Sequence, residues 1–362
     1  MAARMHRVRL VACFFISGAA FVVAGCVASL PETPSSNPEG GKVRGTTLAS
    51  PLTMNVEVEE RILVLDAQHI TEHDVVATLA LGPTPRIILL HGGVYGTNLI
   101  MMSFAKFLVS MGYPDSKIRD PSDGSQSQDP YRSSKRLAGE IAWYYEHDGV
   151  RPMMVGHSQG GVQAVKVLYE LDGAFADKLA VWNAVTDSRE ERYSIADPVS
   201  GEQRSVIGVS LAYVSIVGAG GLALMAPADW AMAQRLHIIP NTVDDFTGFS
   251  IDYDPIALTF PGPDSANRFR PTLTAEVRNV ALPWTYSHVF VPQTAALAAD
   301  AKMREWLNSY LPGAGNGQPP GTDEGRAGNA LWAADVWFSI KKHWCIEAQR
   351  FIEAKRAALG AE

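Results

Sequence analysis

MMVGHSQGG, residues 153–161, is the stretch that decides how this chain folds. An apolar run stands before its G-x-S-x-G pattern, and Val162, Val165 and Leu168 follow at helical spacing. A serine in a sharp turn between a buried strand and a helix is lifted above the edge of the sheet, and the crowded turn favours glycine two residues away on either side. The stretch therefore predicts a strand, a turn and a helix, with Ser158 at the turn as a nucleophile.

A second apolar run, residues 86–90, ends in His91-Gly92-Gly93 at about the distance of one strand–helix unit before Ser158. With both features together, the chain resembles the α/β-hydrolase family, and in particular its lipases and esterases. The resemblance implies a mostly parallel central sheet with helices on both faces, and cleavage of carboxylic esters through an acyl-enzyme on Ser158. It also implies an oxyanion hole made by backbone N–H groups near Gly93 and at Gln159.

Strand-like and helix-like segments alternate over residues 52–312, which predicts one α/β-hydrolase domain there, and strands are expected at 55–58 and 61–65. The pattern becomes irregular over about 186–232, which contains a long apolar run interrupted by glycines. In the lipases that this chain resembles, insertions at this point often cover the active site, so we expect a cap-like insertion. Residues 313–362 are expected to form a Gly/Pro-rich loop and an extra C-terminal helix. The apolar stripe of this helix is expected to pack against the domain core.

The base is expected to be a histidine that follows Ser158, because the family order is serine, acid, histidine. Three histidines qualify: His237, His288 and His343. His288 is favoured, since it lies between a predicted strand at 276–282 and a predicted helix at 294–311, where the family keeps its base. The alternative for His288 is a structural hydrogen bond in a partly buried loop.

The acid is expected after the strand-like run at 236–240. Four aspartates lie in this region: Asp244, Asp245, Asp252 and Asp254. The segment 241–247 resembles the turn that carries the acid in this family, with Asn in place of its glycine, and this favours Asp244. Asp245 is the second candidate, because an offset of one residue would exchange the two. Asp252 and Asp254 are alternatively turn or cap residues.

The N-terminus is typical of an export signal: residues 1–25 hold a positive leader, an apolar run and the start of Val23-Ala24-Gly25-Cys26. These four residues resemble the bacterial lipobox, which implies a lipidated Cys26 and an exported lipoprotein tethered to a membrane of the cell envelope. An ordinary signal peptide or an uncleaved anchor is the alternative. Residues 26–51 are expected to be a flexible tether. After such processing Cys26 carries the lipid and Cys345 is the only cysteine in the mature body, so no internal disulfide can form.

The sequence also excludes some classes of partner and cofactor. Its formal net charge is −7, and no basic patch indicates nucleic-acid binding. HITEH, residues 69–73, matches the zinc motif H-x-x-E-H, which needs one unbroken helix. Thr71 followed by Asp74 instead predicts a capping box that opens a helix and leaves His69 outside it. We therefore expect a small-molecule or lipid ester as partner, with no metal and no cofactor.

Two other functions are compatible with these residues. An acyltransferase would use the same triad and differ only in whether water or another acceptor takes the acyl group. A non-catalytic surface lipoprotein would keep the fold to bind a partner or a lipid. Such a protein is expected to lack a member of the triad, whereas this sequence has candidates for all three.

Overall fold

The computed structural model describes residues 54–259, 268–283, 287–322 and 327–360. The chain divides into two units, Met1–Thr47 and Leu48–Glu362, and all described residues belong to the second. The predicted signal peptide (1–25), the predicted lipidation site Cys26 and the whole predicted tether (26–51) lie outside the described residues. Within the described ranges, no helix has the length and apolar character needed to span a membrane.

A five-stranded sheet forms the centre of the described unit, with strand order β1-β2-β7-β9-β11 and every neighbouring pair parallel. Its strands are β1 (Ile87–Leu90), β2 (Met153–His157), β7 (Leu211–Val217), β9 (Val243–Ile251) and β11 (Glu276–Leu282). The predicted α/β class is thus confirmed. Because all strands run the same way, their carboxyl ends meet at one edge, and the loops that leave these ends lie close together.

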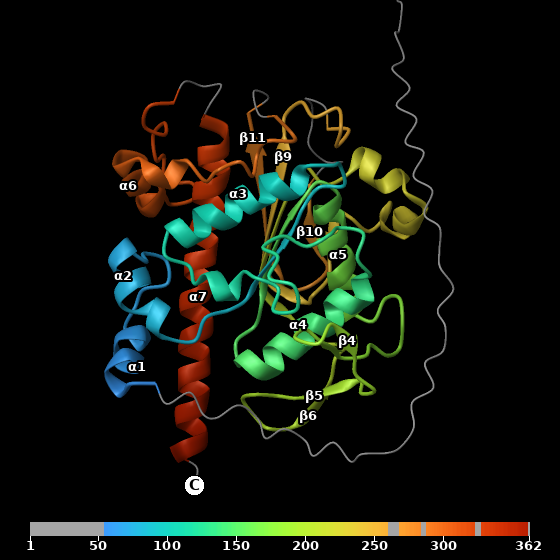
Figure 1. Cartoon of the computed structure of the whole chain (residues 1–362), viewed down its shortest axis with the longest axis vertical. Helices are drawn as coiled ribbons and strands as arrows, with labels where there is room; N and C mark the ends of the chain where they lie inside the picture. Colours follow the sequence, from blue (N-terminus) through green and yellow to red (C-terminus); the bar gives the residue numbers. More distant parts are fainter. Residues whose placement is uncertain (1–53, 260–267, 284–286, 323–326, 361–362) are drawn as a thin grey trace, which may run out of the picture. The chain divides into compact units, whose positions relative to one another are not determined.

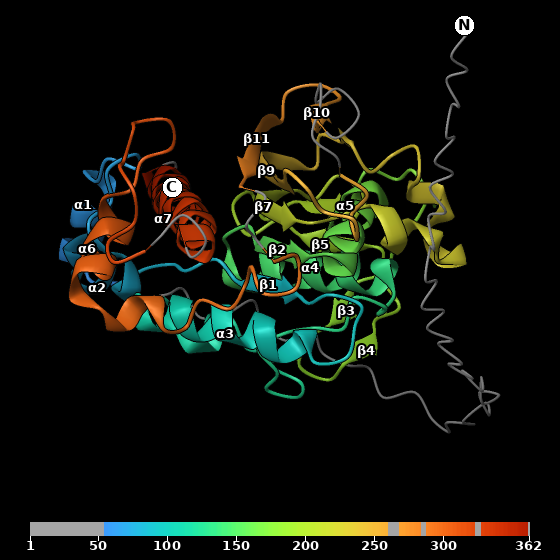
Figure 2. The same cartoon turned by 90° about the horizontal axis from the view of Figure 1, so that it is seen from above.

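Helices cover both faces of the sheet, as Figures 1 and 2 show. One face packs on α3 (Thr97–Ser110) and α7 (Ala327–Gly360), with α1 (Val56–Leu63), α2 (Glu72–Ala77) and α6 (Ala301–Ser309) packed around α7 and α3. The other face packs on α4 (Ser134–Asp148) and α5 (Gln159–Leu171). Side chains of β1 alternate between the two cores, since successive strand residues point to opposite faces.

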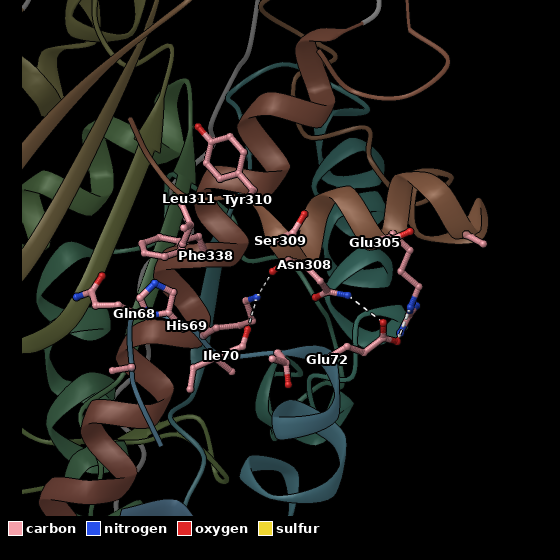
Figure 3. A pocket seen from close by; sticks show the side chains of 15 residues that line it. Gln68, His69, Ile70, Glu72, Glu305, Asn308, Ser309, Tyr310, Leu311 and Phe338 are labelled. Atoms are coloured by element: carbon pink, nitrogen blue, oxygen red, sulfur yellow. Dashed lines mark hydrogen bonds and ion pairs between the residues drawn. The ribbon is translucent and has the colours of Figure 1, made fainter. Parts of the chain in front are cut away.

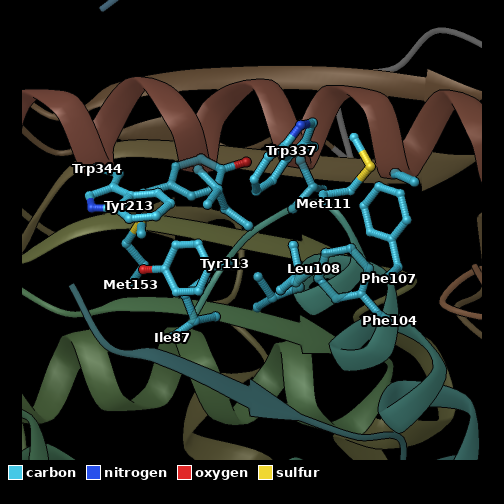
Figure 4. Packing of buried hydrophobic residues seen from close by; sticks show 14 of the residues in the cluster. Ile87, Phe104, Phe107, Leu108, Met111, Tyr113, Met153, Tyr213, Trp337 and Trp344 are labelled. Carbon is cyan, nitrogen blue, oxygen red and sulfur yellow. The ribbon is translucent and has the colours of Figure 1, made fainter. Parts of the chain in front are cut away.

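The C-terminal helix α7 supplies a large part of the core on its face of the sheet. Trp337 and Trp344 of this helix are completely buried, and Figure 4 shows them pointing toward Tyr113, Tyr213 and the aromatic side chains of α3. The Trp344 ring lies 4.6 Å from the Tyr113 ring in an edge-on arrangement. The helix expected at the C-terminus is therefore present and is an integral layer of the domain.

Strands were expected at 55–58 and 61–65, and this expectation is wrong because most of these residues lie in helix α1 (Val56–Leu63). Asn55 caps the helix by accepting a hydrogen bond from the N–H of Glu57. Val58 and Ile62, four residues apart, are buried on one side of this helix, which packs on α7. The apolar residues that suggested strands are thus the buried face of a short helix.

The cap-like insertion expected over 186–232 is partly wrong, because residues 211–217 are the central strand β7. This strand is completely buried on both faces, which explains its continuous apolar sequence. Before it, 182–205 forms two antiparallel hairpins that pack on α4. Their strands are β3 (Trp182–Asn183), β4 (Ser188–Arg189), β5 (Ser194–Ala196) and β6 (Gln203–Ser205). Only 218–232 follows a carboxyl end of the sheet.

The remaining elements are short. They are the 3-10 helices η1 (Leu79–Leu81), η2 (Asp115–Lys117), η3 (Gly221–Met225), η4 (Pro227–Met232) and η6 (Leu297–Ala299), and the two-stranded pair β8 (Ile238–Ile239) and β10 (Arg270–Pro271). The segment that holds η3 and η4 stands beside α5 in Figure 1. It is the part of the predicted cap that lies at the carboxyl edge of the sheet.

Candidate active site

Ser158 occupies the turn between β2 and α5, as predicted from the sequence. Its backbone has φ 55° and ψ −119°, a conformation that side-chain-bearing residues rarely adopt. The flanking glycines are required by space: a Cβ on Gly156 would stand 2.5 Å from the carbonyl oxygen of Gly160, and one on Gly160 would collide with the Leu90 carbonyl. The strained turn thus holds the serine hydroxyl outward at the carboxyl edge of the sheet.

His288 lies within hydrogen-bond distance of this serine. Its Nε2 is 2.9 Å from Ser158 Oγ, although the two residues are 130 positions apart in the chain. The histidine follows strand β11, whose bounds match the strand predicted at 276–282. Its loop is fixed to α3, because the N–H groups of Thr294 and Ala295 both donate to Ser103 Oγ. A base held in this position can take the hydroxyl proton.

Asp254 completes the arrangement on the other side of the histidine. Its Oδ2 is 2.5 Å from His288 Nδ1, and its Oδ1 accepts hydrogen bonds from the N–H groups of Ile256 and Ala257. Burial by itself raises the pKa of the Asp254 carboxyl, but the hydrogen bonds and the attraction to His288 outweigh it and leave this pKa below its ordinary value. The carboxylate is therefore charged and can hold the imidazole with Nε2 toward the serine.

The predictions that Asp244, or else Asp245, orients the histidine are both wrong. Asp244 forms a bidentate ion pair with Arg151, and Asp245 binds Lys342 and His343. Both aspartates stand at the amino end of β9, whereas Asp254 follows its carboxyl end. The strand separates the two ends by roughly 20 Å or more, at about 3.3 Å per residue, so neither carboxylate can reach a histidine beside Ser158.

A signal for Asp254 is present in the sequence but depends on placing the strand correctly. In a parallel sheet the acid must follow a carboxyl end, and Asp254 stands three positions after Ile251, the last residue of β9. The sequence pattern instead favoured a strand at 236–240, where the structure has only the two-residue strand β8. Because the strand was expected too early in the sequence, the acid was expected at Asp244, at the amino end of β9, instead of at Asp254, after its carboxyl end.

The loop at Gly92 and Gly93 lies directly against the nucleophile. A Cβ on Gly92 would stand 3.4 Å from Ser158 Cβ, and one on Gly93 would stand 3.1 Å from Gln159 Cβ. Among the described residues, neither the N–H of Gly93 nor that of Gln159 donates a hydrogen bond to another group. Both N–H groups are thus available beside Ser158, and their role as an oxyanion hole stays a prediction.

His157 is a member of the site that the sequence did not single out. It is completely enclosed, and its Nε2–H donates to the His288 carbonyl oxygen at 2.7 Å, which ties the end of β2 to the loop of the base. Burial, followed by the nearby His288, lowers the pKa of the His157 imidazole to about 4. The imidazole is therefore neutral near pH 7 and acts as a fixed hydrogen-bond donor.

The segment 218–232 contacts the site at two places. Gly218 lies against His288, because a Cβ there would stand 2.8 Å from Cε1 of its ring. Farther along, the buried Asp229 accepts a hydrogen bond from the Gln159 side chain at 2.7 Å and pairs with Lys166 at 3.2 Å. This segment is consequently anchored to α5 just after the nucleophile.

The loops at this edge of the sheet expose several large apolar side chains. They come from the loops that follow β1, β7, β9 and β11, which also carry or flank Ser158, Asp254 and His288. These residues are Val94, Tyr95, Leu222, Met225, Trp230, Tyr253, Ile256, Leu258 and Phe290. We call this set the apolar rim. Exposed apolar side chains gathered on several loops around a site indicate contact with an apolar ligand or surface.

The H-x-x-E-H stretch does not form a helical pair of histidines. Thr71 and Asp74 make the predicted capping box, and α2 begins at Glu72. His69 stands outside the helix and binds Asp66, while Glu72 binds Arg304. In the ranges that the structure describes, no group of three or more His, Cys, Asp and Glu side chains is placed to hold a metal ion.

Comparisons with known proteins add little to this site. No protein family model and no curated protein matches the sequence. Among solved structures, the chain is similar to "RedJ with PEG molecule bound in the active site", with a TM-score of 0.29 and 14% identity, over 64% of this chain and 91% of that one. A likeness of this size carries no argument about activity, so the function has to be inferred from the site itself.

Proposed function

We propose that this protein is a serine hydrolase of the α/β-hydrolase type that cleaves carboxylic esters, with Ser158, His288 and Asp254 as its triad. The observation that carries this proposal is the continuous chain of contacts from Asp254 Oδ2 to His288 Nδ1 and from His288 Nε2 to Ser158 Oγ. The strained backbone of the serine, at a strand–helix turn, is the second feature of such enzymes that is present here.

The reaction follows from the positions of these groups. Ser158 Oγ attacks the ester carbonyl while His288 Nε2 accepts the hydroxyl proton, and a tetrahedral adduct with a negative oxygen forms. The N–H groups near Gly93 and at Gln159 would stabilise that oxygen. Collapse of the adduct breaks the bond to the alcohol, which leaves with the proton from His288. Water, deprotonated by His288, then attacks the acyl-enzyme and releases the carboxylic acid and free Ser158.

The apolar rim supports an ester with a large hydrophobic part. Nine large apolar side chains on the loops at the carboxyl edge of the sheet, the edge that carries Ser158, remain exposed to water. Burial of such side chains against a substrate is favourable, by about 25 cal/mol for each Å² of apolar surface. We therefore place the substrate among esters of medium or long acyl chains, with residues 218–232 as the cap-like wall of the site. Transfer of the acyl group to an acceptor other than water would use the same residues.

The test is hydrolysis of p-nitrophenyl esters of graded chain length by the purified protein. Ser158→Ala is expected to abolish turnover and labelling by a fluorophosphonate probe, because no other group can form the acyl-enzyme. Ser116→Ala, which changes an exposed serine far along the chain from the site, is the matched control and should behave as the wild type. Equal turnover by Ser158→Ala and wild type would reject the proposal.

We also propose that the protein is an exported lipoprotein. The support is the sequence alone: a positive leader, an apolar run and a lipobox-like tetrapeptide that ends at Cys26. Removal of residues 1–25 and lipidation of Cys26 would tether the hydrolase domain to a membrane of the cell envelope through residues 26–51.

A further inference from the structure

A cavity of about 590 Å³ lies between residues 67–72, helix α6 and helix α7. Figure 3 shows the side chains that line it. Its wall is mainly apolar and includes Ala67, Ile70, Leu311 and Phe338. This volume is within the range of sites for small organic ligands. None of the residues that line it belongs to the triad or to the apolar rim, so the cavity is separate from the candidate active site.

Lys341 of α7 is the buried charge of this cavity. The residue is only 3% exposed, and its Nζ donates to the carbonyl oxygens of Ile70 at 2.7 Å and Asn308 at 2.9 Å, both from residues that also line the cavity. The Nζ atom also lies 5.8 Å from the centroid of the Trp337 ring. An ammonium group has three N–H donors, so the two carbonyl acceptors leave one donor for the ring face or for a ligand.

No carboxylate neutralises this ammonium group within ion-pair distance in the described part of the chain. The nearest acidic side chains are occupied elsewhere: Glu72 binds Arg304 and Asn308, and Asp74 caps α2. Burial lowers the pKa of the Lys341 amine to about 8, while Asp74 and Glu72 oppose this only from a distance. A buried cation without a counter-charge is unfavourable, and an anionic ligand would remove that penalty.

We propose that this cavity binds a long-chain carboxylate, with the hydrocarbon chain against Ile70, Leu311 and Phe338 and the carboxylate at Lys341 Nζ. A single negative charge matches Lys341, which has no carboxylate partner, whereas Arg304, the other cation that lines the cavity, is paired with Glu72. The side chains that line the cavity include Glu72 and Glu305, whose carboxylates disfavour a headgroup of higher negative charge. The inference does not rest on the proposed function, although hydrolysis of fatty esters would release ligands of this kind.

The first test measures binding of a fluorescent carboxylate, 11-(dansylamino)undecanoate, to the full chain that carries Ser158→Ala, so that turnover cannot interfere. Unlabelled dodecanoate should displace the probe, and dodecanol should do so about tenfold more weakly or worse, because the alcohol lacks the charge that Lys341 binds. Absence of probe binding, or equal displacement by the alcohol and the carboxylate, would overturn the proposal.

The second test locates the bound ligand by filling the cavity. Ser309→Trp adds an indole to an exposed residue of α6 that lines the cavity, and is expected to weaken probe binding about tenfold or more. Lys302→Trp makes the same change at an exposed residue of the same helix that does not line the cavity, and should leave binding unchanged. Binding by Ser309→Trp as tight as that of the wild type would place the ligand elsewhere and refute the assignment.

The third test separates the charge of Lys341 from its structural role. Lys341→Met keeps the length of the side chain without the charge, and is expected to weaken dodecanoate binding about tenfold while dodecanol binding stays the same. Lys341→Arg should restore part of the preference for the carboxylate. If Lys341→Met does not fold, as judged by circular dichroism, the pair Ser309→Trp and Lys302→Trp decides the question. A folded Lys341→Met that still prefers the carboxylate would contradict the proposed headgroup site.

Discussion

At the scale of single residues, the site depends on which carboxylate faces His288. Asp254 is held by two backbone N–H groups as well as by the histidine, so its position does not depend on a flexible ion pair. Asp244, by contrast, is 48% exposed in its side chain and pairs with Arg151. The three-dimensional position of a carboxylate, and not its distance in sequence from the serine, decides whether it can orient the base.

We expect Asp254→Asn to lower kcat about 10³- to 10⁴-fold while the protein stays folded, because the amide would favour the wrong imidazole tautomer. Asp244→Asn and Asp252→Asn are matched controls and should keep kcat within about twofold of the wild type. Steady-state hydrolysis of a p-nitrophenyl ester measures all three. A strong loss of kcat in Asp244→Asn, with no loss in Asp254→Asn, would restore the aspartate that the sequence favoured.

His157 should make stability depend on pH in a defined window. The pKa of its imidazole is lowered from 6.5 to about 4 by burial, so the unfolded chain binds this proton more readily than the folded one between these values. The stabilisation is complete above about pH 6.5 and is lost as the pH falls toward 4. At pH 4.5 the loss relative to pH 7 is expected to be about 2–3 kcal/mol from this group.

Urea unfolding of wild type and His157→Asn at pH 7 and pH 4.5 tests this contribution. Asparagine keeps an N–H donor but does not titrate, and the carboxylates that also titrate in this range are common to both proteins. The wild type should therefore lose about 2–3 kcal/mol more than the variant between the two pH values. The same loss in both proteins would mean that His157 is not a buried neutral imidazole.

At the scale of elements, α7 shows how strongly the C-terminal part of the chain contributes to the domain. Trp344 is completely buried, contacts the Tyr113 ring and donates its Nε1–H to the Pro83 carbonyl oxygen at 3.2 Å. The helix therefore links the sheet to the N-terminal segment that precedes β1. Residues 313–362 were expected as a Gly/Pro-rich loop and an extra C-terminal helix packed against the domain, and the described part of this helix does pack there, as one layer of the domain.

Trp344→Ala is expected to lower the free energy of unfolding by about 3–5 kcal/mol, because it leaves a cavity in the core and an unpaired carbonyl oxygen. Leu359→Ala on the same helix removes a side chain that is 65% exposed, and should change this free energy by less than about 0.5 kcal/mol. Chemical denaturation of the two variants provides the comparison. If Trp344→Ala changed the free energy of unfolding as little as Leu359→Ala does, α7 would not be part of the domain core.

At the scale of the whole molecule, the chain combines the described unit with an N-terminal region that carries the proposed signal and lipidation site. The described unit buries Cys345 completely, so this thiol is not accessible for modification. Burial also raises the pKa of the Cys345 thiol to about 12, which keeps it protonated and unreactive. Lipidation should therefore depend on Cys26 alone.

Replacement of Cys26 by Ser is expected to move the protein from the membrane fraction to the soluble fraction and to abolish labelling by an alkynyl palmitate analogue, since the serine cannot carry the lipid. Cys345→Ala is the control and should be labelled like the wild type. Cell fractionation and click labelling of the expressed full chain measure both effects. Unchanged labelling and fractionation of Cys26→Ser would reject the lipoprotein proposal while leaving the hydrolase proposal untouched.

The parallel sheet explains why the three proposed catalytic residues meet. Ser158, Asp254 and His288 each follow the carboxyl end of a strand, and β2, β9 and β11 all point to the same edge. Strand β7 stands between β2 and β9 and sets their separation. The predicted cap-like insertion overlooked this strand, so the expected topology lacked the element that positions the acid.

The sequence by itself determined the local features of this protein. Three such features were predicted correctly: the strand, turn and helix around Ser158, the capping box at Thr71, and the strand that leads to His288. Each of them depends on residues that are close together in the sequence. Such features follow from backbone geometry, spacing and capping, which neighbouring residues specify directly.

Only the tertiary structure decided the identity of the acid and the course of residues 211–217. Apolar runs fit a buried strand, a cap or a helix equally well when they are seen in isolation. Pairing between distant strands fixes which of these forms, and it also decides which end of β9 faces the serine. That pairing joins strands whose partner residues are more than 30 positions apart in the chain. Asp254 is therefore identified by its position at the carboxyl end of β9 beside His288, and not by a local sequence motif.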